Sequence, residues 1–235
     1  MKKAIYLILS FFLLLACSKN EVEDVEDFTG DSGTFTDSRD KKVYKWLRIG
    51  DQIWMAENLA FLPSVYPPEA GSSTEARYYV YGYSGTDVNA GKQVENFSKY
   101  GVLYNWQAAQ SASPPGWHLP TDEEWKQLEQ WIGMTKEQAN ATGWRGDDHG
   151  LILKATTSWN LNGNGTNSVG FTAFPGGLRG SEEGFYNIGI GGYWWSSTQS
   201  SSVDAWYRVL YWSIPNVSRY YLNKDYGFSI RCVKD

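Results

Sequence analysis

The chain is poor in the residues that bind metals and form disulfides. Its 235 residues include two cysteines and two histidines, which are Cys17, Cys232, His118 and His149. The histidines are far apart in the sequence and have no third partner, which argues against a zinc or iron centre. Cys17 closes an N-terminal apolar run, so Cys232 alone cannot supply a paired-thiol copper site. We therefore expect no metal and no cofactor.

The chain also lacks a long hydrophobic run. Its longest, Ala4–Leu15, has about twelve residues, and a membrane-spanning helix needs roughly twenty. Lys2 and Lys3 precede this run, which is typical of a secretory signal. Leu14-Leu15-Ala16-Cys17 resembles a bacterial lipobox, which implies that Cys17 is lipidated and begins the mature protein. The alternatives are an ordinary signal peptide cut near Ala16 and a buried first strand. We expect a signal peptide over 1–16 and an outer-membrane lipoprotein.

Positive charge is scarce as well. Without Lys2 and Lys3, 19 basic residues face 26 acidic ones, a formal net charge of −7. This balance argues against nucleic acid and against an anionic membrane surface as partners. Residues 21–27 are mostly acidic and are followed by Gly, Ser and Thr, so we predict a flexible tether over 17–39. The acidic run also resembles the surface-export signals of Bacteroidetes lipoproteins, although a solvated spacer explains it equally well.

Aromatic residues are abundant. The chain has 12 Trp and 16 Tyr, yet its mean hydropathy is −0.46. This combination is typical of an extracellular β-rich domain, in which large rings fill the core and their polar tips reach partners. Cys232 alternates with Phe228 and Ile230, so we expect it to be a buried structural thiol.

The clearest helix signal lies within Gly116–Gly133. Pro120 excludes a helix that continues from upstream, Thr121 is a suitable N-cap, and Glu124 completes a capping box. An apolar stripe then follows with helical spacing, formed by Trp125, Leu128, Trp131 and Ile132. We expect this helix to cover the strands that follow it.

The remaining pattern consists of short strands separated by turns. Strands are predicted at Val43–Ile49, Gln52–Met55, Tyr78–Tyr83, Gly170–Phe174, Tyr193–Thr198, Ala205–Trp212 and Tyr226–Val233. Tyr100–Ala109 begins like a strand and becomes helical, and Met134–Thr142 is a weak helix. Loops are predicted at 61–78, 87–92 and 158–167. No repeat of fixed period is present.

Six segments stand in the order of one known family. They are IGDQIWMAENL at 49–59, LYNW at 103–106, GWHLPTDEEW at 116–125, GF at 170–171 with FPGG at 174–177, WSST at 195–198 and GFSIRCV at 227–233. Together they resemble the Fibrobacter succinogenes major paralogous domain, here over 40–235. The family is similar in pattern to the C-type-lectin-like fold, shared more distantly with formylglycine-generating enzymes. The resemblance implies an α+β domain with short antiparallel strands, one or two helices and long loops, and no known activity.

Lectins of this fold bind calcium and sugar together through acidic loops. The corresponding segments here are Ile214-Pro215-Asn216 and Trp159-Asn160-Leu161, which lack the acid that calcium prefers. We therefore expect any glycan binding to be independent of calcium. The adjacent acids Asp147-Asp148 and Glu182-Glu183 leave glycoside hydrolysis open as an alternative.

A flat aromatic face beside amide groups is a common means of holding a sugar. The loop at 158–167 has this composition, with Trp159, Asn160, Asn162 and Asn164, and the surface is extended by Trp194, Asp204 and Trp206. Core packing of the tryptophans and turn formation by the asparagines are the competing explanations. We expect a non-catalytic binding or adhesion module for a glycan or an envelope protein. The alternative is an enzyme related to formylglycine-generating enzymes or a carbohydrate hydrolase.

Overall fold

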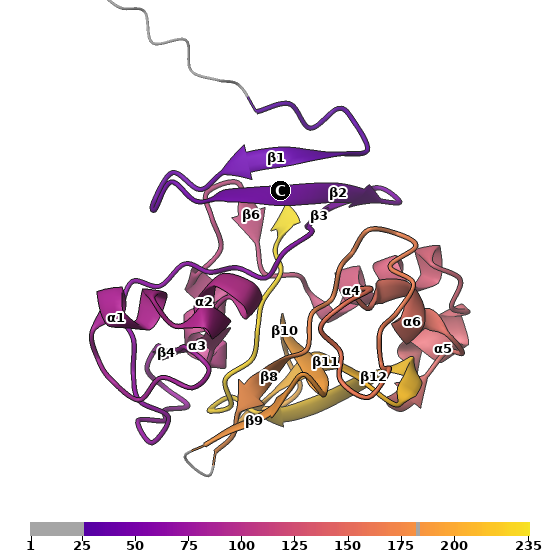
Figure 1. The fold of residues 1–235 in the computed structure, drawn as a ribbon. Helices are drawn as coiled ribbons and strands as arrows, with labels where there is room; N and C mark the ends of the chain where they lie inside the picture. Colours follow the sequence, from indigo (N-terminus) through magenta and orange to yellow (C-terminus); the bar gives the residue numbers. More distant parts are fainter. Residues whose placement is uncertain (1–25, 182–183) are drawn as a thin grey trace, which may run out of the picture.

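The computed structural model describes residues 26–181 and 184–235. An N-terminal sheet and a larger C-terminal sheet form its upper and lower layers in Figure 1, and short helices lie on either side between them. This confirms a mixed α+β domain. The signal segment and Cys17 lie outside the described residues. No helix within the described ranges has the length and apolar character that crossing a membrane requires.

The N-terminal sheet has the strand order β1-β2-β3-β13-β6. Its strands are β1 (Ser32–Thr36), β2 (Val43–Ile49), β3 (Gln52–Met55), β13 (Val233–Lys234) and β6 (Trp117–His118). Val233 pairs with both Trp54 and His118, so the C-terminal strand lies between two segments from the first half of the chain. The sheet therefore joins the two ends of the domain.

The C-terminal sheet has the order β7-β12-β11-β10-β8-β9. Its strands are β7 (Gly143–Arg145), β12 (Ile214–Asn223), β11 (Asp204–Tyr211), β10 (Gly191–Gln199), β8 (Gly176–Arg179) and β9 (Phe185–Ile188). A separate pair joins β4 (Tyr78–Tyr79) to β5 (Leu103–Tyr104). The helices are α1 (Val88–Lys92), α2 (Glu95–Tyr100), α3 (Trp106–Ser111), α4 (Asp122–Trp131), α5 (Lys136–Asn140) and α6 (His149–Leu153).

Elements with strong local signals lie where the sequence predicts them. β2 and β3 have the predicted bounds, and both halves of the Thr121–Glu124 capping box are present at the start of α4. Helix α5 falls within the weak helix predicted at 134–142. Cys232 is fully buried, which confirms the predicted buried thiol, and burial raises the pKa of that thiol to about 12.

Other predictions were wrong because contacts distant in sequence decide these segments. The predicted strand Gly170–Phe174 makes only an isolated bridge from Ala173 to Lys154, and most of Tyr226–Val233 makes single bridges instead of a ladder. The predicted loop at 87–92 contains α1, capped by Asp87. Strand β12 was missed, because Pro215 and Asn216 interrupt its pattern.

The tether predicted over 17–39 ends earlier than expected. Residues 32–36 form β1, which pairs along its whole length with β2, and Phe35 is buried against Trp117 with ring centroids 4.3 Å apart. A domain cut at residue 40 would lack this strand and expose the rings beneath it. The folded domain therefore begins before the boundary that the sequence suggests.

The core face of α4 also differs from the predicted stripe. Trp125 and Leu128 are buried as expected, and Trp125 packs against Trp54 at 4.8 Å. Trp131 is instead 56% exposed, and the fully buried Glu129 lies on the inner face. The reason is electrostatic, because arginines from β7 and β11 meet the Glu129 carboxylate inside the domain.

His118 makes the stability of the domain depend on pH. Its ring nitrogens lie 2.7 Å from carboxylate oxygens of Asp235 and Glu124. Partial burial alone would lower the pKa of His118, but hydrogen bonds to Asp235 and then Glu124 outweigh this effect and raise it. A raised pKa means that the contribution of His118 is complete below the unfolded pKa of about 6.5 and is lost as pH rises through the folded pKa.

We expect the wild type to unfold at a higher urea concentration than His118→Gln. This difference between the two urea midpoints should be larger near pH 6 than near pH 9. Subtracting the variant cancels the titration of the groups that His118 does not contact. A difference that stays constant across this range would show that His118 is not stabilised in its charged form.

Candidate functional site

The loop predicted to bind a ligand does not present an aromatic face. Trp159 is only 4% exposed, and its Nε1 donates a 3.0 Å hydrogen bond to the Ala173 carbonyl. The Lys154 ammonium, which is itself buried, lies 5.2 Å from the centroid of its ring. The expectation that Trp159 offers its ring to a ligand was therefore wrong, since the ring fills the core beneath the loop.

The three asparagines predicted to bind a ligand are exposed, and the structure gives two of them a local role. Asn164 accepts a hydrogen bond from the backbone of Trp159, and the Asn160 carboxamide lies close against Gly189. Asn162 has a positive φ of 61°, which asparagine adopts more readily than most residues. These features are turn chemistry, the competing explanation for this segment.

The three residues predicted to extend the binding surface, Trp194, Asp204 and Trp206, do not form a common exposed surface. Trp194 is 1% exposed and donates to Asn58, and its neighbour Trp195 is fully buried, so neither reaches solvent. Trp206 is half-buried beneath the Arg219 guanidinium, which lies 3.7 Å from its ring centroid. Asp204 is half-buried at the start of β11, where it bonds to Ser201. The structure therefore does not gather the predicted residues into one surface.

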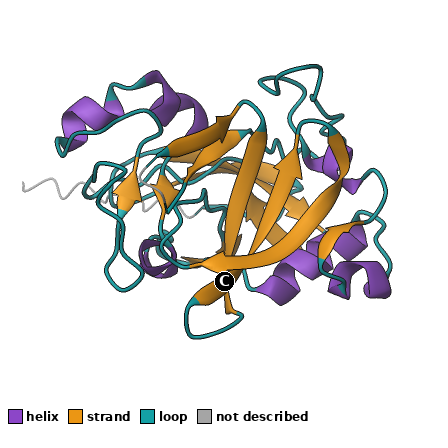
Figure 2. Cartoon of the chain, turned by 90° about the horizontal axis from the view of Figure 1, so that it is seen from below, coloured by secondary structure: helices purple, strands orange, loops and turns teal. Residues whose placement is uncertain are grey.

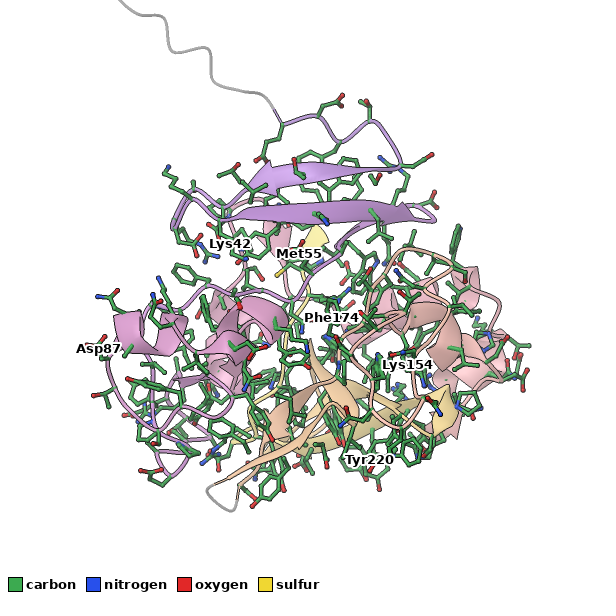
Figure 3. All side chains as sticks on the ribbon, viewed as in Figure 1. Lys42, Met55, Asp87, Lys154, Phe174 and Tyr220 are labelled. Atoms are coloured by element: carbon green, nitrogen blue, oxygen red, sulfur yellow. The ribbon has the colours of Figure 1, made fainter. Side chains whose placement is uncertain are left out.

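A different aromatic surface lies on the open face of the C-terminal sheet. Figure 2, seen from below, shows the broad strands of this sheet in front, with helices at the margins. Figure 3 places Tyr220 below the sheet and Lys154 above it. A hollow of about 460 Å³ lies on this face. We call it the aromatic hollow, lined by Gly143, Trp144, Tyr193, Tyr207, Val209, Tyr211, Ile214, Ser218 and Tyr220.

Strand register explains the shape of the aromatic hollow. Tyr193 pairs with Val209, Val209 with Ser218, and Ser218 with Trp144, which places these four side chains in one row across four strands. The two middle residues are small and form the floor, and the outer two are large rings. With strands about 4.8 Å apart, the row spans roughly 14 Å.

The neighbouring rows close the two remaining sides. Tyr207 pairs with Tyr220 on one side of the floor, and Tyr211 pairs with Ile214 on the other. Tyr207 packs against Phe228 with ring centroids 4.9 Å apart, and this contact holds its ring in place. Tyr220 is 45% exposed, as is Trp144, so two rings at the rim are available to a ligand.

The polar groups of the aromatic hollow are uncharged. Burial, followed by the neighbouring hydroxyls of Tyr193, Tyr220 and Tyr226, raises the pKa of Tyr207 to about 12, so its hydroxyl stays protonated. The Asn187 side chain donates to the Tyr193 hydroxyl at 2.8 Å. No lining residue is acidic or basic. The surface therefore offers rings and neutral hydroxyls.

The hollow has a smaller neighbour on the same sheet. A cavity of about 240 Å³ is lined by Leu178, Gly180, Ser181, Tyr186, Asn187 and Tyr226. Asn187 lines this cavity and donates a hydrogen bond to Tyr193, which lines the aromatic hollow. The cavity and the hollow therefore adjoin at this pair of residues.

His149, one of the potential catalytic groups, is held inside the domain, whereas the carboxylate pair Asp147 and Asp148 is exposed. His149 is 5% exposed, and its Nδ1 accepts a 3.0 Å hydrogen bond from the Asp147 backbone. Within the described ranges no three His, Cys, Asp or Glu residues come together as metal ligands would. Glu182 and Glu183, one of the carboxylate pairs considered for hydrolysis, lie outside the described residues.

Part of the aromatic hollow was visible in the sequence. Tyr207, Val209 and Tyr211 alternate within one predicted strand, so they share a face. Trp144 gave no such signal, because it lies in a three-residue strand that the sequence presents as loop. Tyr220 was missed together with β12.

Comparison with known proteins yields a family and no function. The model of the Fibrobacter succinogenes major domain matches residues 47–234, which is most of the chain. Neither the curated proteins nor the solved structures include a match. The resemblance carried by the six sequence segments is thus confirmed, and the chain belongs to the Fibrobacter succinogenes major domain family.

Proposed function

We propose that this protein is a non-catalytic carbohydrate-binding module that holds a neutral glycan in the aromatic hollow. One observation carries the proposal, namely that rings surround a shallow floor and no charged side chain lines it. Pyranose rings present apolar C–H faces and many hydroxyls. Stacking on Trp144 and Tyr220 suits the former, and the hydroxyls of Tyr207, Tyr211 and Ser218 suit the latter.

The ligand is bound without calcium in this proposal. Calcium prefers several carboxylate or carbonyl oxygens, and the hollow contains no acid. The same feature disfavours the hydrolase alternative, because glycoside hydrolysis needs two carboxylates beside the scissile bond. A C-type-lectin-like arrangement belongs to the proposal as well, supported by the way β13 returns beside β3 to join the chain ends.

The cellular setting is part of the same proposal. The signal pattern over 1–16 and the lipobox at Cys17 support an outer-membrane lipoprotein in the cell envelope. The acidic stretch after Cys17 would hold the domain away from the membrane. If this stretch acts as a surface-export signal, the domain would lie at the cell surface. Adhesion to a glycan is the role that such a display serves best, and an envelope protein is the competing ligand.

We expect Trp144→Ala and Tyr220→Ala each to weaken glycan binding by about two- to tenfold, because each removes one stacking surface. The measurement is a glycan array on the full chain, with and without chelator, followed by titration of the best neutral glycan. Both rings are substantially exposed, so the melting temperature should change little.

Trp131→Ala is the matched control, since Trp131 is the most exposed tryptophan and lies on α4, away from the hollow. It should leave affinity unchanged. Equal losses in all three variants, or an array without any bound glycan, would contradict the proposal. Binding abolished by chelator would show that a metal site had been missed.

A further inference from the structure

A second groove lies on the opposite side of the domain from the aromatic hollow, along β2. It has two parts of about 720 and 480 Å³, which adjoin each other because both are lined by Glu57 and Phe174. Figure 3 shows Phe174 beneath the middle of β2 and Lys42 near one end of that strand. We call these two parts together the β2 groove.

One wall of the β2 groove is a strand face with a regular period. Alternation along β2 puts Val43, Lys45 and Leu47 on the same face, and all three line the groove. Val43 is 55% exposed although it is apolar, and Lys45 is exposed between it and Leu47. Apolar and cationic side chains therefore alternate here with the spacing of an extended chain.

The other wall comes from loops of the domain body. It contains Val169 and Thr172 in one part and Phe97, Ser98 and Lys99 in the other. Phe174 lies at the junction, where its ring contacts Tyr100 edge-on at 6.4 Å. This wall thus repeats the composition of the strand face, with apolar groups beside one free cation.

The groove concentrates cations that have no acidic partner. Eight lysines and arginines in the described residues are neither buried nor ion-paired: Lys41, Lys42, Lys45, Arg48, Lys92, Lys99, Lys136 and Lys234. Four of these line the β2 groove, namely Lys42, Lys45, Arg48 and Lys99, against two acids, Asp31 and Glu57. The whole chain has a formal charge of −5, so this positive patch runs against the overall balance.

We propose that the β2 groove binds an acidic, extended polypeptide segment of a partner protein. An extended peptide repeats its side chains every two residues, as β2 does, so carboxylates can face Lys45 and Lys99 while apolar side chains meet Val43, Leu47 and Phe174. An anionic polysaccharide would satisfy the cations but leave the aliphatic groups without a matching partner. The combination of charge and aliphatic surface therefore favours a peptide.

The test is fluorescence anisotropy with the full chain and a labelled ten-residue peptide in which pairs of leucines alternate with pairs of glutamates, so that each face of the extended peptide presents leucine and glutamate in turn. A second peptide has glutamine in place of every glutamate. We expect the acidic peptide to bind at least about tenfold more tightly, and its affinity to fall as salt is raised. Lys45→Glu combined with Lys99→Glu should weaken binding by about tenfold or more.

Lys136→Glu is the matched control, because Lys136 is also exposed and unpaired but lies on α5, outside the groove. It should bind the acidic peptide like the wild type. Equal affinity for the two peptides, or an equal loss in Lys136→Glu, would overturn the proposal. So would binding of polygalacturonate in the groove without binding of the peptide.

The two proposals fail separately. Trp144→Ala should bind the peptide like the wild type but bind the glycan more weakly, and the paired lysine variant should do the reverse. Loss of peptide binding in Trp144→Ala would place the peptide in the aromatic hollow and overturn the assignment to the β2 groove.

Discussion

Glu129→Gln is expected to destabilise the domain by about 3–5 kcal/mol, although the substitution preserves the size of the side chain. The Glu129 carboxylate is fully buried and accepts hydrogen bonds from Arg208 Nε at 2.6 Å and Arg145 Nη2 at 2.7 Å. Loss of its charge would leave Arg145 buried without any carboxylate. Removing one member of a buried ion pair is costly, because the remaining charge has already lost its water.

The surrounding network makes this loss hard to repair. Asp122 already receives Arg208 at 2.8 Å and Arg219 at 2.7 Å, so it has no capacity left for Arg145. Burial would raise the pKa of Asp122, but Arg219 and Arg208 more than offset this effect and hold it well below its usual range. Three buried arginines thus depend on two carboxylates, and Glu129 is the only one that reaches Arg145.

The measurement is the free energy of unfolding in urea by linear extrapolation. Glu123→Gln is the control on the same helix, because Glu123 is exposed and pairs only with Lys126; it should change stability by no more than about 0.5 kcal/mol. Adding Arg145→Met to Glu129→Gln should restore part of the loss. Simple additivity in the double variant would show that the ion pair does not carry the effect.

Trp159→Ala is expected to cost about 3–5 kcal/mol, the usual range for removing a buried tryptophan. The substitution would empty a site among Leu153, Phe171 and Trp194 of the same core cluster. It would also leave the Ala173 carbonyl without the indole donor. Glycan binding at the aromatic hollow should persist in the folded fraction, since Trp159 does not line it.

Trp144→Ala provides the comparison, with an expected cost below about 1 kcal/mol because Trp144 is 45% exposed. Thermal melts and urea titrations of the two variants, side by side, give the answer. A Trp159 variant as stable as the wild type would place this ring on the surface and revive the loop as a binding site.

Both predictions concern residues that the local sequence would place at the surface and that the structure buries. Glu129 lies within an amphipathic helix, where a charged side chain normally faces solvent. Trp159 lies among asparagines and glycines, where a ring normally lies at the surface. In each case the deciding partners, Arg145 and Arg208 or Ala173, come from other segments of the chain.

The sequence by itself determined the elements whose signals lie within about ten residues. Strand β2 follows from its alternation, and α4 follows from Pro120, Thr121 and Glu124, since a capping box closes through neighbouring backbone groups. The order of six short segments also determined the family, because that information is linear. The buried thiol of Cys232 belongs here as well, as its alternation with Phe228 and Ile230 indicated a covered face.

Only the tertiary structure decided which aromatic residues reach solvent. The row Tyr193, Val209, Ser218 and Trp144 exists because β10, β11, β12 and β7 align in one register, and no local pattern links Trp144 to Tyr193. A strand has two faces of equal local chemistry, and packing against helices or other strands determines which face is covered. For this reason composition indicated that aromatic side chains would reach the surface, but only the fold could show that they gather on the open face of the C-terminal sheet.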